Sequence, residues 1–446
     1  MEIDYLKNFQ LYTPYFPSKW TQIPLYELAT WVNGLAFREI NFSKIGRPII
    51  KISEIKNGIS VQTKFTDSSY NNSIFIQKGD MLFCWSGQPE TSIDIHYWRE
   101  MEGWLNQHIY KIIVKKICEP DFFYYIMKYI KPNLISIARN KQTTGLGHVT
   151  KKDLQSIIVS YPEIKLQKAI SKILVPLDAQ IDLLNKMNET LESMARALFK
   201  SWFVDFDPVR KKVAGEPTGL SPEIDALFPD SFEESELGDI PKGWQIKDIG
   251  EVVDIVGGST PSTKKTSFWN GDFSFATPKD LSNADSPILI NTERKITEQG
   301  VSQISSQLLP KGTLLLSSRA PIGYLSLTDI PVSINQGFIA VKKESKLPPN
   351  YMYFWLKENM ELIKGNANGT TFQEISKSNF RMIKTIFPNN EIIDNFKNYI
   401  TIIIKQITNN TYESKNLKNL RDNLLPKLIS GELEIPDIDA ILEKAK

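Results

Sequence analysis

Apolar residues recur in alternating steps of four and three along two stretches of the chain, near residues 170–202 and 396–428. This spacing is that of the a and d positions of a coiled coil, and it continues for more than four heptads in each stretch. The first seam comprises Ile170, Leu174, Leu177, Ile181, Leu184, Asn188, Leu191, Ala195, Leu198 and Trp202. The second comprises Phe396, Ile400, Ile403, Ile407, Asn410, Ser414, Leu417, Arg421, Leu424 and Leu428. Because neither seam can stay exposed to water, we predict two long helices that pair with each other.

Polar residues interrupt both seams. Asn188 and Asn410 lie near the two midpoints, and Ser414 and Arg421 make the second seam less regular. Asparagine at a seam position costs stability but fixes register and partner; the alternative is a poorly packed surface asparagine. Pro176 is expected to kink the first helix or to mark its true start.

Shorter periodicities precede each seam. Alternating runs broken by Gly, Pro and Asn predict strands at residues 49–52, 80–84, 109–114, 312–316 and 338–341. Residues 122–130 and 351–360 each predict one short amphipathic helix. The expected class is therefore α+β, with two strand-dominated globules.

The two globules repeat one another. Residues 142–162 (QTTGLGHVTKKDLQSIIVSYP) align with residues 368–388 (NGTTFQEISKSNFRMIKTIFP), at an offset of 388 − 162 = 226. Further matches pair residues 17–20 with 241–244, 78–89 with 311–323, 105–109 with 334–338, and 120–128 with 349–357. The offset drifts between 241 − 17 = 224 and 311 − 78 = 233, which indicates loop insertions between fixed elements. Variable recognition is expected where the offset drifts, between residues 57 and 102 and between 257 and 328.

The repeat predicts the organisation of the chain. A globule at the end of each helix favours antiparallel pairing, with the globules related by a pseudo-two-fold axis. The predicted segments are a first globule (1–162), a first helix (163–204), an acidic, Pro-rich wrapped connection (205–240), a second globule (241–388), a second helix (389–430) and a tail (431–446). The acidity of the connection makes it a poor surface for DNA.

Composition narrows the class of protein. The chain has 446 residues and a net charge of +2, which excludes a generally basic nucleic-acid coat but not local basic surfaces. Two cysteines, Cys84 and Cys118, are expected as buried free thiols, and with three histidines they leave little for a zinc site. No apolar run is long enough for a membrane span or a signal peptide, so we expect a cytoplasmic protein without membrane partners.

Signatures of catalysis are mostly missing. No phosphate-binding loop for ATP is present, and Gly257-Gly258-Ser259-Thr260 has the wrong spacing for one, so we interpret it as a turn. Glu54-x-Lys56 and Glu163-x-Lys165 have an acid-x-lysine form but lack a partner aspartate for a nuclease metal site. The offset of 226 places Glu54 on Asp280, and a lone carboxylate per half forms neither a metal site nor an acid–base pair. No catalytic or metal-ligating residue is therefore predicted.

Small polar loops are shared by the two halves instead. Hydroxyls and backbone N–H groups of such loops suit phosphate contacts, and Arg, Lys and Gln side chains suit base edges in the major groove. Ser86–Gln88 and Ser317–Arg319 form one such pair of loops. The candidate DNA-binding residues are Lys64, Ser86, Gln88, Thr143, Thr144, Lys264, Lys265, Arg319, Thr370, Thr371 and Gln373. The alternative for each is an ordinary solvated loop.

Several strings carry a resemblance to the specificity subunit of type I restriction–modification enzymes. They are LFKSWFVDFDPVR (198–210), WNGDFSFATPKDL (269–281), SSRAPIGYL (317–325), INQGFIAV (334–341) and LRDNLLPKLISGEL (420–433). The resemblance covers essentially the whole chain, although the first globule matches only in outline.

The resemblance implies two target recognition domains, each binding one half of a split DNA site, separated by a long antiparallel two-helix coiled coil that spaces them. It implies that the chain is a non-catalytic subunit and binds no cofactor itself. Two methyltransferase subunits would supply S-adenosylmethionine and adenine N6 methylation, and restriction subunits would add ATP- and Mg-dependent translocation and cleavage.

Two alternatives remain open at this point. One is a single-chain DNA nuclease or modification enzyme with an unrecognised site, which would act on DNA without partners. The other is a coiled-coil adaptor that binds protein only, which would show no preference among DNA sequences.

Overall fold

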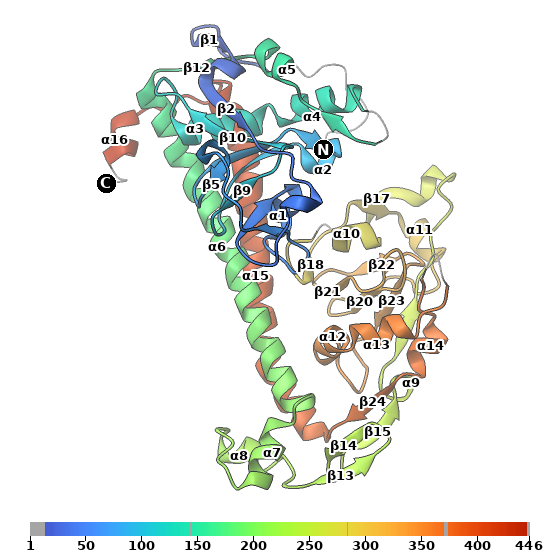
Figure 1. The fold of residues 1–446 in the computed structure, drawn as a ribbon. Coiled ribbons are helices and arrows are strands. Elements are labelled where there is room, and N and C mark those ends of the chain that lie inside the picture. Colours follow the sequence, from blue (N-terminus) through green and yellow to red (C-terminus); the bar gives the residue numbers. More distant parts are fainter. Residues whose placement is uncertain (1–13, 143–144, 283, 370–372, 444–446) are drawn as a thin grey trace. The chain divides into compact units, whose positions relative to one another are not determined.

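The chain divides into two compact units, each made of one strand-rich domain and sections of both long helices. The computed structural model describes residues 14–142, 145–282, 284–369 and 373–443 (Figure 1). Unit 1 comprises residues 1–179 and 417–446, and unit 2 comprises residues 180–416. The long helices are α6 (Ile164–Phe203) and α15 (Asn390–Ile429), of 40 residues each. The division follows the repeat that the sequence predicts.

Unit 1 is built on a four-stranded antiparallel sheet. Its strand order is β2 (Ala29–Asn33), β10 (Ile109–Val114), β6 (Met81–Cys84) and β8 (Asp94–Tyr97). A second sheet has the order β4 (Phe65–Thr66), β3 (Arg47–Ile50), β9 (Gly103–Leu105) and β5 (Phe75–Ile76), with β3 and β9 parallel. A strand pair, β1 (Thr21–Pro24) with β12 (Ile158–Tyr161), leads into α6. The helices of unit 1 include α3 (Pro120–Tyr129), α4 (Lys131–Asn140) and α5 (Lys151–Ser156).

Unit 2 has the same plan. Its main sheet has the order β16 (Ile255–Gly257), β23 (Phe338–Val341), β20 (Leu314–Ser317), β21 (Leu325–Thr328) and β18 (Ile288–Leu289). A second sheet has the order β19 (Arg294–Ile296), β17 (Trp269–Ala276) and β22 (Val332–Ile334), with β17 and β22 parallel. A strand pair, β15 (Gln245–Asp248) with β24 (Lys384–Phe387), leads into α15. The helices of unit 2 include α12 (Pro349–Glu358), α13 (Met360–Gly365) and α14 (Lys377–Arg381).

Equivalent contacts confirm that the two domains are one fold written twice. Thr21 pairs with Tyr161 in unit 1, and Gln245 pairs with Phe387 in unit 2, which reproduces the offsets of 224 and 226. The hydroxyl of Thr150 accepts a hydrogen bond from the N–H of Asp153 at the start of α5, and Ser376 does the same for Asn379 at the start of α14. The long repeated stretch is thus a capped helix followed by a strand, a framework element in both units.

Two local expectations were wrong. The strand expected at residues 49–52 is observed at Arg47–Ile50, because Glu54 accepts a hydrogen bond from the N–H of Lys51 and α1 (Ile52–Asn57) begins there. One helix was expected where each domain has two in succession, α3 with α4 and α12 with α13. Pro132 in the first turn of α4 lacks an N–H for the preceding turn, so α3 ends before it.

The acidic connection carries regular structure of its own. It contains α7 (Asp207–Ala214), α8 (Pro222–Asp225) and a hairpin of β13 (Phe232–Ser235) with β14 (Gly238–Pro241). Five of its apolar side chains are buried in the main core of unit 2, namely Phe206, Val209, Ile224, Phe228 and Ile240. The connection therefore packs on unit 2 through its apolar residues and leaves its acids on the surface.

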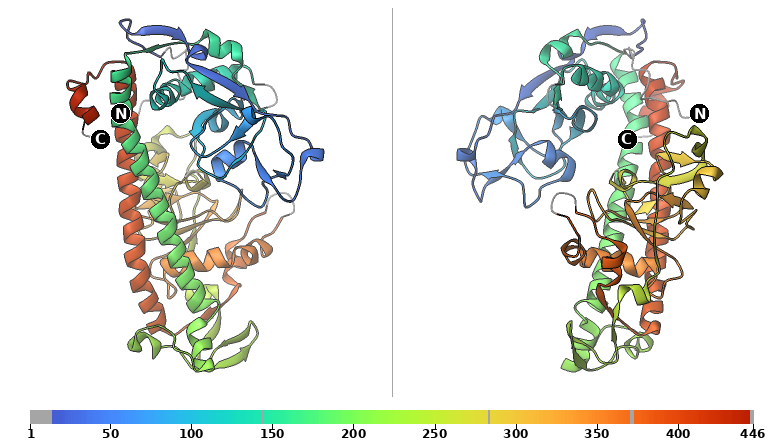
Figure 2. Two further views of the ribbon diagram at one scale, coloured as in Figure 1. Left: turned by 60° about the vertical axis from the view of Figure 1, so that its left-hand side comes forward. Right: turned by 90° about the vertical axis from the view of Figure 1, so that its right-hand side faces the viewer.

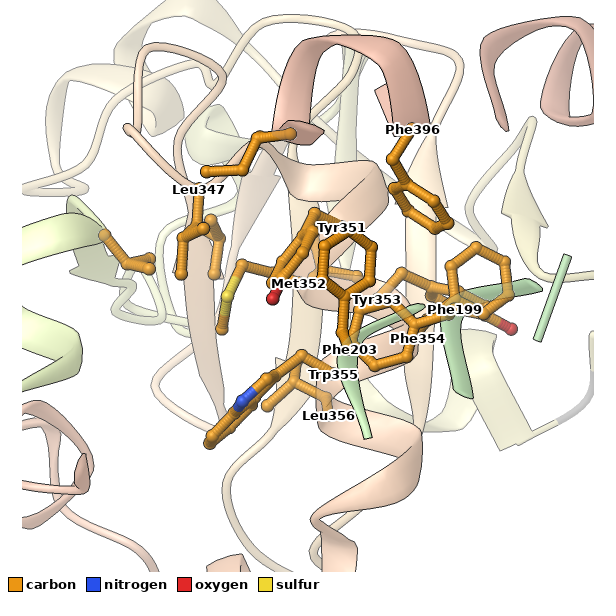
Figure 3. Packing of buried hydrophobic residues seen from close by; sticks show 14 of the residues in the cluster. Phe199, Phe203, Leu347, Tyr351, Met352, Tyr353, Phe354, Trp355, Leu356 and Phe396 are labelled. Carbon is orange, nitrogen blue, oxygen red and sulfur yellow. The ribbon is translucent and has the colours of Figure 1, made fainter. Parts of the chain in front are cut away.

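Within each unit, the section of α6 lies beside that of α15, and the two run antiparallel (Figure 2). In unit 1, Ile170 and Leu174 share a core with Leu428 and Ile429. In unit 2, Phe199 and Phe203 pack on Phe396, and Tyr351 of α12 packs on all three rings (Figure 3). Each domain core therefore contains both long helices, which confirms the predicted pairing.

Pro176 lies inside α6, which begins at Ile164, so the expectation that it marks the helix start was wrong. Its side chain is exposed.

The polar seam residues have partners. In unit 2, the amide of Asn410 donates to Asn188 Oδ1 at 2.9 Å, and both residues are 2% exposed. Ser414 donates to Asn185 Oδ1 at 3.3 Å. In unit 1, Arg421 Nη1 donates to Asp178 Oδ1 at 2.6 Å, while the other oxygen of Asp178 accepts from the hydroxyl of Tyr125 on α3. The alternative of a poorly packed surface asparagine is therefore wrong for Asn188 and Asn410.

Cys84 and Cys118 are buried free thiols, as expected, and burial raises the pKa of each to about 12. Among the described residues, every helix is too short or too polar to cross a membrane.

The buried asparagine pair yields a stability prediction. Asn410→Ala leaves the buried Oδ1 of Asn188 without its donor, so we expect the free energy of unfolding to fall by about 1–3 kcal/mol. Asn188→Leu with Asn410→Leu removes both polar groups and should recover most of that loss. Chemical denaturation measures both, with Asn409→Ala, an exposed neighbour on α15, as the control. The single variants Asn188→Leu and Asn410→Leu are measured beside the double variant. The pairing would be contradicted if the double variant lost as much free energy of unfolding as the two single variants lose together.

Candidate nucleic-acid interface

Four loops of unit 1 meet at one end of its main sheet. The N–H of Trp85, after β6, donates to His108 O before β10 at 3.3 Å, and Trp85 O accepts from the N–H of Val149 at 2.8 Å. The N–H of Gln107 donates to Leu35 O, after β2, at 2.9 Å. Residues 33–35, 85–88, 106–108 and 147–149 are called the loop edge of unit 1.

Unit 2 has an equivalent loop edge. The N–H of Ser318, after β20, donates to Gly337 O at 2.8 Å, and Ser318 O accepts from the N–H of Ile375 at 3.0 Å. Residues 257–260, 318–319, 335–337 and 374–375 are called the loop edge of unit 2. The same backbone contacts therefore bring together loops that are far apart in the sequence in both units.

Glycine is required at one matching position of each edge. A Cβ atom on Gly34 would lie 2.1 Å from Asn106 O, and one on Gly258 would lie 1.9 Å from Ile334 O. Gly257 is the last residue of β16, and Gly258 directly after it lies at a close backbone approach, so the prediction of a turn at residues 257–260 was wrong.

The contacts correct one alignment. Trp85 and Ser318 make equivalent hydrogen bonds, at an offset of 318 − 85 = 233. Ser86 therefore corresponds to Arg319, and the match of Ser86–Gln88 with Ser317–Arg319 was wrong by two residues. The contacts support the match of residues 78–89 with 311–323, which has the same offset of 311 − 78 = 233.

The predicted DNA-binding residues divide into three groups. Ser86 and Gln88 lie at the loop edge of unit 1, while Arg319 lies at that of unit 2 and Gln373 directly precedes it. Thr143, Thr144, Thr370 and Thr371 lie outside the described residues.

Three predicted lysines are exposed but lie away from the loop edges. The carbonyl oxygen of Lys64 accepts from the N–H of Ile49, in the second sheet of unit 1. Lys264 and Lys265 precede a short 3-10 helix (Thr266–Phe268), and Lys265 Nζ lies 5.3 Å from the centre of the Phe268 ring.

Sequence reasoning missed several residues of the two edges. Trp85 donates from Nε1 to Asn33 Oδ1 at 3.0 Å, and its ring lies 5.8 Å from that of His108. An Asn-Gln pair, Asn106-Gln107 in unit 1 and Asn335-Gln336 in unit 2, occupies the turn before β10 and before β23. The repeat in the sequence already aligns the two Asn-Gln pairs at one offset. Their position at the loop edges, however, follows only from the folded sheet.

Charges at the edge of unit 2 are only loosely paired. Arg319 Nη1 lies 3.7 Å from Glu374 Oε2, and the two side chains are 38% and 47% exposed. Such a pair contributes little to stability, so the guanidinium of Arg319 can exchange Glu374 for another acceptor at small cost.

Other basic residues of unit 1 are already held by an internal carboxylate. Burial opposes the charge of Asp94, but the ammonium groups of Lys128 and Lys131, 2.8 and 2.6 Å away, lower its pKa to about 2. Burial lowers the pKa of neighbouring His96 to about 4, so its ring is neutral at pH 7. These groups stabilise β8 against α3 and α4 and are not available to a nucleic acid.

The two carboxylates that the repeat aligns, Glu54 and Asp280, have structural roles. Glu54 Oε2 accepts from the N–H of Lys51 at 3.0 Å, and Asp280 Oδ2 accepts from the N–H of Thr277 at 2.8 Å. Each begins a short helix, α1 or α10 (Pro278–Ser282). Across the described parts of the chain, His, Cys, Asp and Glu nowhere gather in threes that could hold a metal ion. What the edges offer instead is backbone N–H groups, amides, a serine and an arginine, which can donate hydrogen bonds to phosphates and base edges.

Comparison with known proteins places the chain in a family. The family model described as the type I restriction modification DNA specificity domain matches residues 17–193 and 241–420. The HindI specificity subunit of Haemophilus influenzae is 27% identical over 408 residues, covering 80% of this chain and 87% of that relative. The EcoBI specificity subunit of Escherichia coli is 23% identical, covering 96% and 92% respectively.

A solved structure shares the fold. The type I restriction–modification S subunit from M. genitalium superposes with a TM-score of 0.53 at 16% identity, covering 93% of this chain and 98% of that one. The two matched segments coincide with the two domains that carry the loop edges. The chain therefore belongs to the type I restriction–modification DNA specificity family and contains two copies of its domain.

Proposed function

We propose that this chain selects the DNA target of a type I restriction–modification complex, with each domain reading one half of a two-part duplex site. The observation that carries the proposal is the pair of loop edges, which share backbone geometry but differ in exposed side chains. Ser86 stands where unit 2 has Arg319, and His108 stands where unit 2 has Gly337. Two readers of different chemistry require a target with two different halves.

Catalysis and cofactors belong to partner subunits in this proposal. The two equivalent carboxylates, Glu54 and Asp280, are occupied in capping helices. Methyltransferase subunits would bring S-adenosylmethionine, and restriction subunits would bring ATP and Mg. Among the residues that the structure describes, we find no contact that favours a single-chain nuclease or a protein-only adaptor.

The helix pair would set the spacing between the half-sites. Its register is supported by the Asn188–Asn410 hydrogen bond in unit 2 and the Asp178–Arg421 ion pair in unit 1. Because each domain core includes both helices, a change in helix length cannot be absorbed by sliding.

Lengthening both helices tests the spacing role. Seven residues inserted after Ala179 and seven after Asn416 preserve the heptad pattern and add ~10 Å of helix, or about 3 base pairs. We expect methylome sequencing to show unchanged half-sites separated by a longer spacer. The control is a seven-residue insertion after Gly219, whose surroundings are open, and it should leave the target unaltered. New base identities at constant spacing would contradict the proposal.

An apolar stripe on α6 is the proposed docking surface for a methyltransferase subunit. Leu183, Met187 and Met194 lie on one face of the helix and are 50%, 40% and 58% exposed. Methionine adapts its shape to a partner surface, and this exposed stripe lies beside the buried seam on the same helix. Burial of one such side chain contributes about 1.5–3 kcal/mol.

Polar substitution tests this docking surface. Leu183→Gln with Met187→Gln should weaken binding of the purified methyltransferase subunit by more than about tenfold and leave thermal unfolding of the chain nearly unchanged. Glu189→Gln, at an exposed position on another face of α6, should bind as the wild type does. Undiminished binding of the double variant would exclude the stripe as the contact.

A further inference from the structure

The Asn-Gln turn is the one element of the loop edges whose exposed side chain is the same in both units. Other equivalent positions differ, such as Trp85 and Ser318, or Ser86 and Arg319. Gln107 and Gln336 occupy the second position of this turn, each two residues before a central strand of the main sheet. The identity of this glutamine in the two units therefore calls for a role that the differing loop residues do not have.

The asparagine of the turn has a structural reason. Its N–H donates across the parallel strand pair, from Asn106 to Ile50 O at 3.0 Å and from Asn335 to Ala276 O at 3.2 Å. Asn335 Oδ1 also accepts from the N–H of Gly337 at 2.9 Å, and Asn106 is only 7% exposed. Folding alone explains why this residue is the same in both units.

The glutamine has no common structural partner. Gln336 is exposed, and its Oε1 accepts from the hydroxyl of Thr260 at 2.6 Å. Gln107 is partly exposed, and its Nε2 lies 3.3 Å from His108 Nε2. Thr260 and His108 come from different loops, so the two neighbours share neither position nor chemistry. An external ligand common to both units accounts for the identity better than packing does.

We propose that the side-chain amides of Gln107 and Gln336 each donate a hydrogen bond to a phosphate of the DNA backbone in their own half-site. This inference rests on the proposed function. Two half-sites of different sequence share the sugar–phosphate backbone, so a donor that is identical in both readers fits a sequence-independent acceptor. The pair would position the two domains on the duplex and leave base reading to the differing loops around it.

Binding measurements on the complete complex test the proposal. Gln107→Ala and Gln336→Ala should each weaken binding to the target duplex about tenfold, the factor expected when one charge-assisted hydrogen bond is lost. The loss should be the same for duplexes carrying single base-pair changes, since phosphate contacts carry no sequence information. The salt dependence of binding should keep its slope, because no charge is removed. Gln22→Ala and Gln245→Ala, at exposed positions of β1 and β15, are matched controls that should bind as the wild type does.

Methylphosphonate substitution of the DNA identifies the acceptor. Each phosphate of the target is neutralised in turn. In each half-site, we expect one position at which neutralisation weakens binding of the wild-type complex. At that position, neutralisation should not further weaken binding of the variant that lacks the matching glutamine. This readout is a comparison on folded complexes, so it does not depend on the stability of a variant.

The outcomes separate the two proposals. A wild-type complex that does not discriminate its target from other duplexes would overturn the proposed function. If the wild type discriminates and both glutamine variants bind equally well, only the phosphate contact is overturned. A glutamine variant that changes the preferred base in its half-site would also overturn it, because the amide would then read a base.

Discussion

The structure depends on the antiparallel pairing of two long helices inside each domain core. Neither α6 nor α15 can bury its seam alone, and each unit takes a section of both. Aromatic packing of Phe199 and Phe203 on Phe396 secures the pair in unit 2, and aliphatic packing of Ile170 and Leu174 on Leu428 secures it in unit 1. The polar contacts Asn188–Asn410 and Asp178–Arg421 add directional bonds that tolerate only one register. These contacts fix the register of the two helices within each unit.

Because the domain is duplicated, a comparison of its two copies distinguishes the contacts that both copies keep from the side chains that differ between them. Backbone hydrogen bonds, helix caps and the close approaches at Gly34 and Gly258 recur in both units because the sheet cannot form without them. Ser86 and Arg319 hold equivalent positions just after β6 and β20, and both side chains are partly exposed. Differences can therefore accumulate there without loss of stability, which is what a family of DNA-specificity proteins requires.

Much of the fold could be predicted from the sequence because its signals are periodic. The seams, the strands at Ile109–Val114 and Phe338–Val341, and the repeated cap and strand were all visible in one dimension. The second helix after α3 and the start of α1 were not, since proline position and a capping acid decided them locally. Residues of the loop edges were predicted in part. Ser86, Gln88 and Arg319 stood out by type, whereas Trp85 and Gln107 reach the same edge only through strand pairing.

The central claim is that two independent readers share one frame, and a domain exchange tests it most directly. Residues 13–159 would be replaced by the matching segment of another specificity subunit, and the methylome of cells carrying the hybrid would be sequenced. The account predicts that one half of the target changes while the other half and the spacer length stay as they were. A change in both halves, or in the spacer, would contradict it.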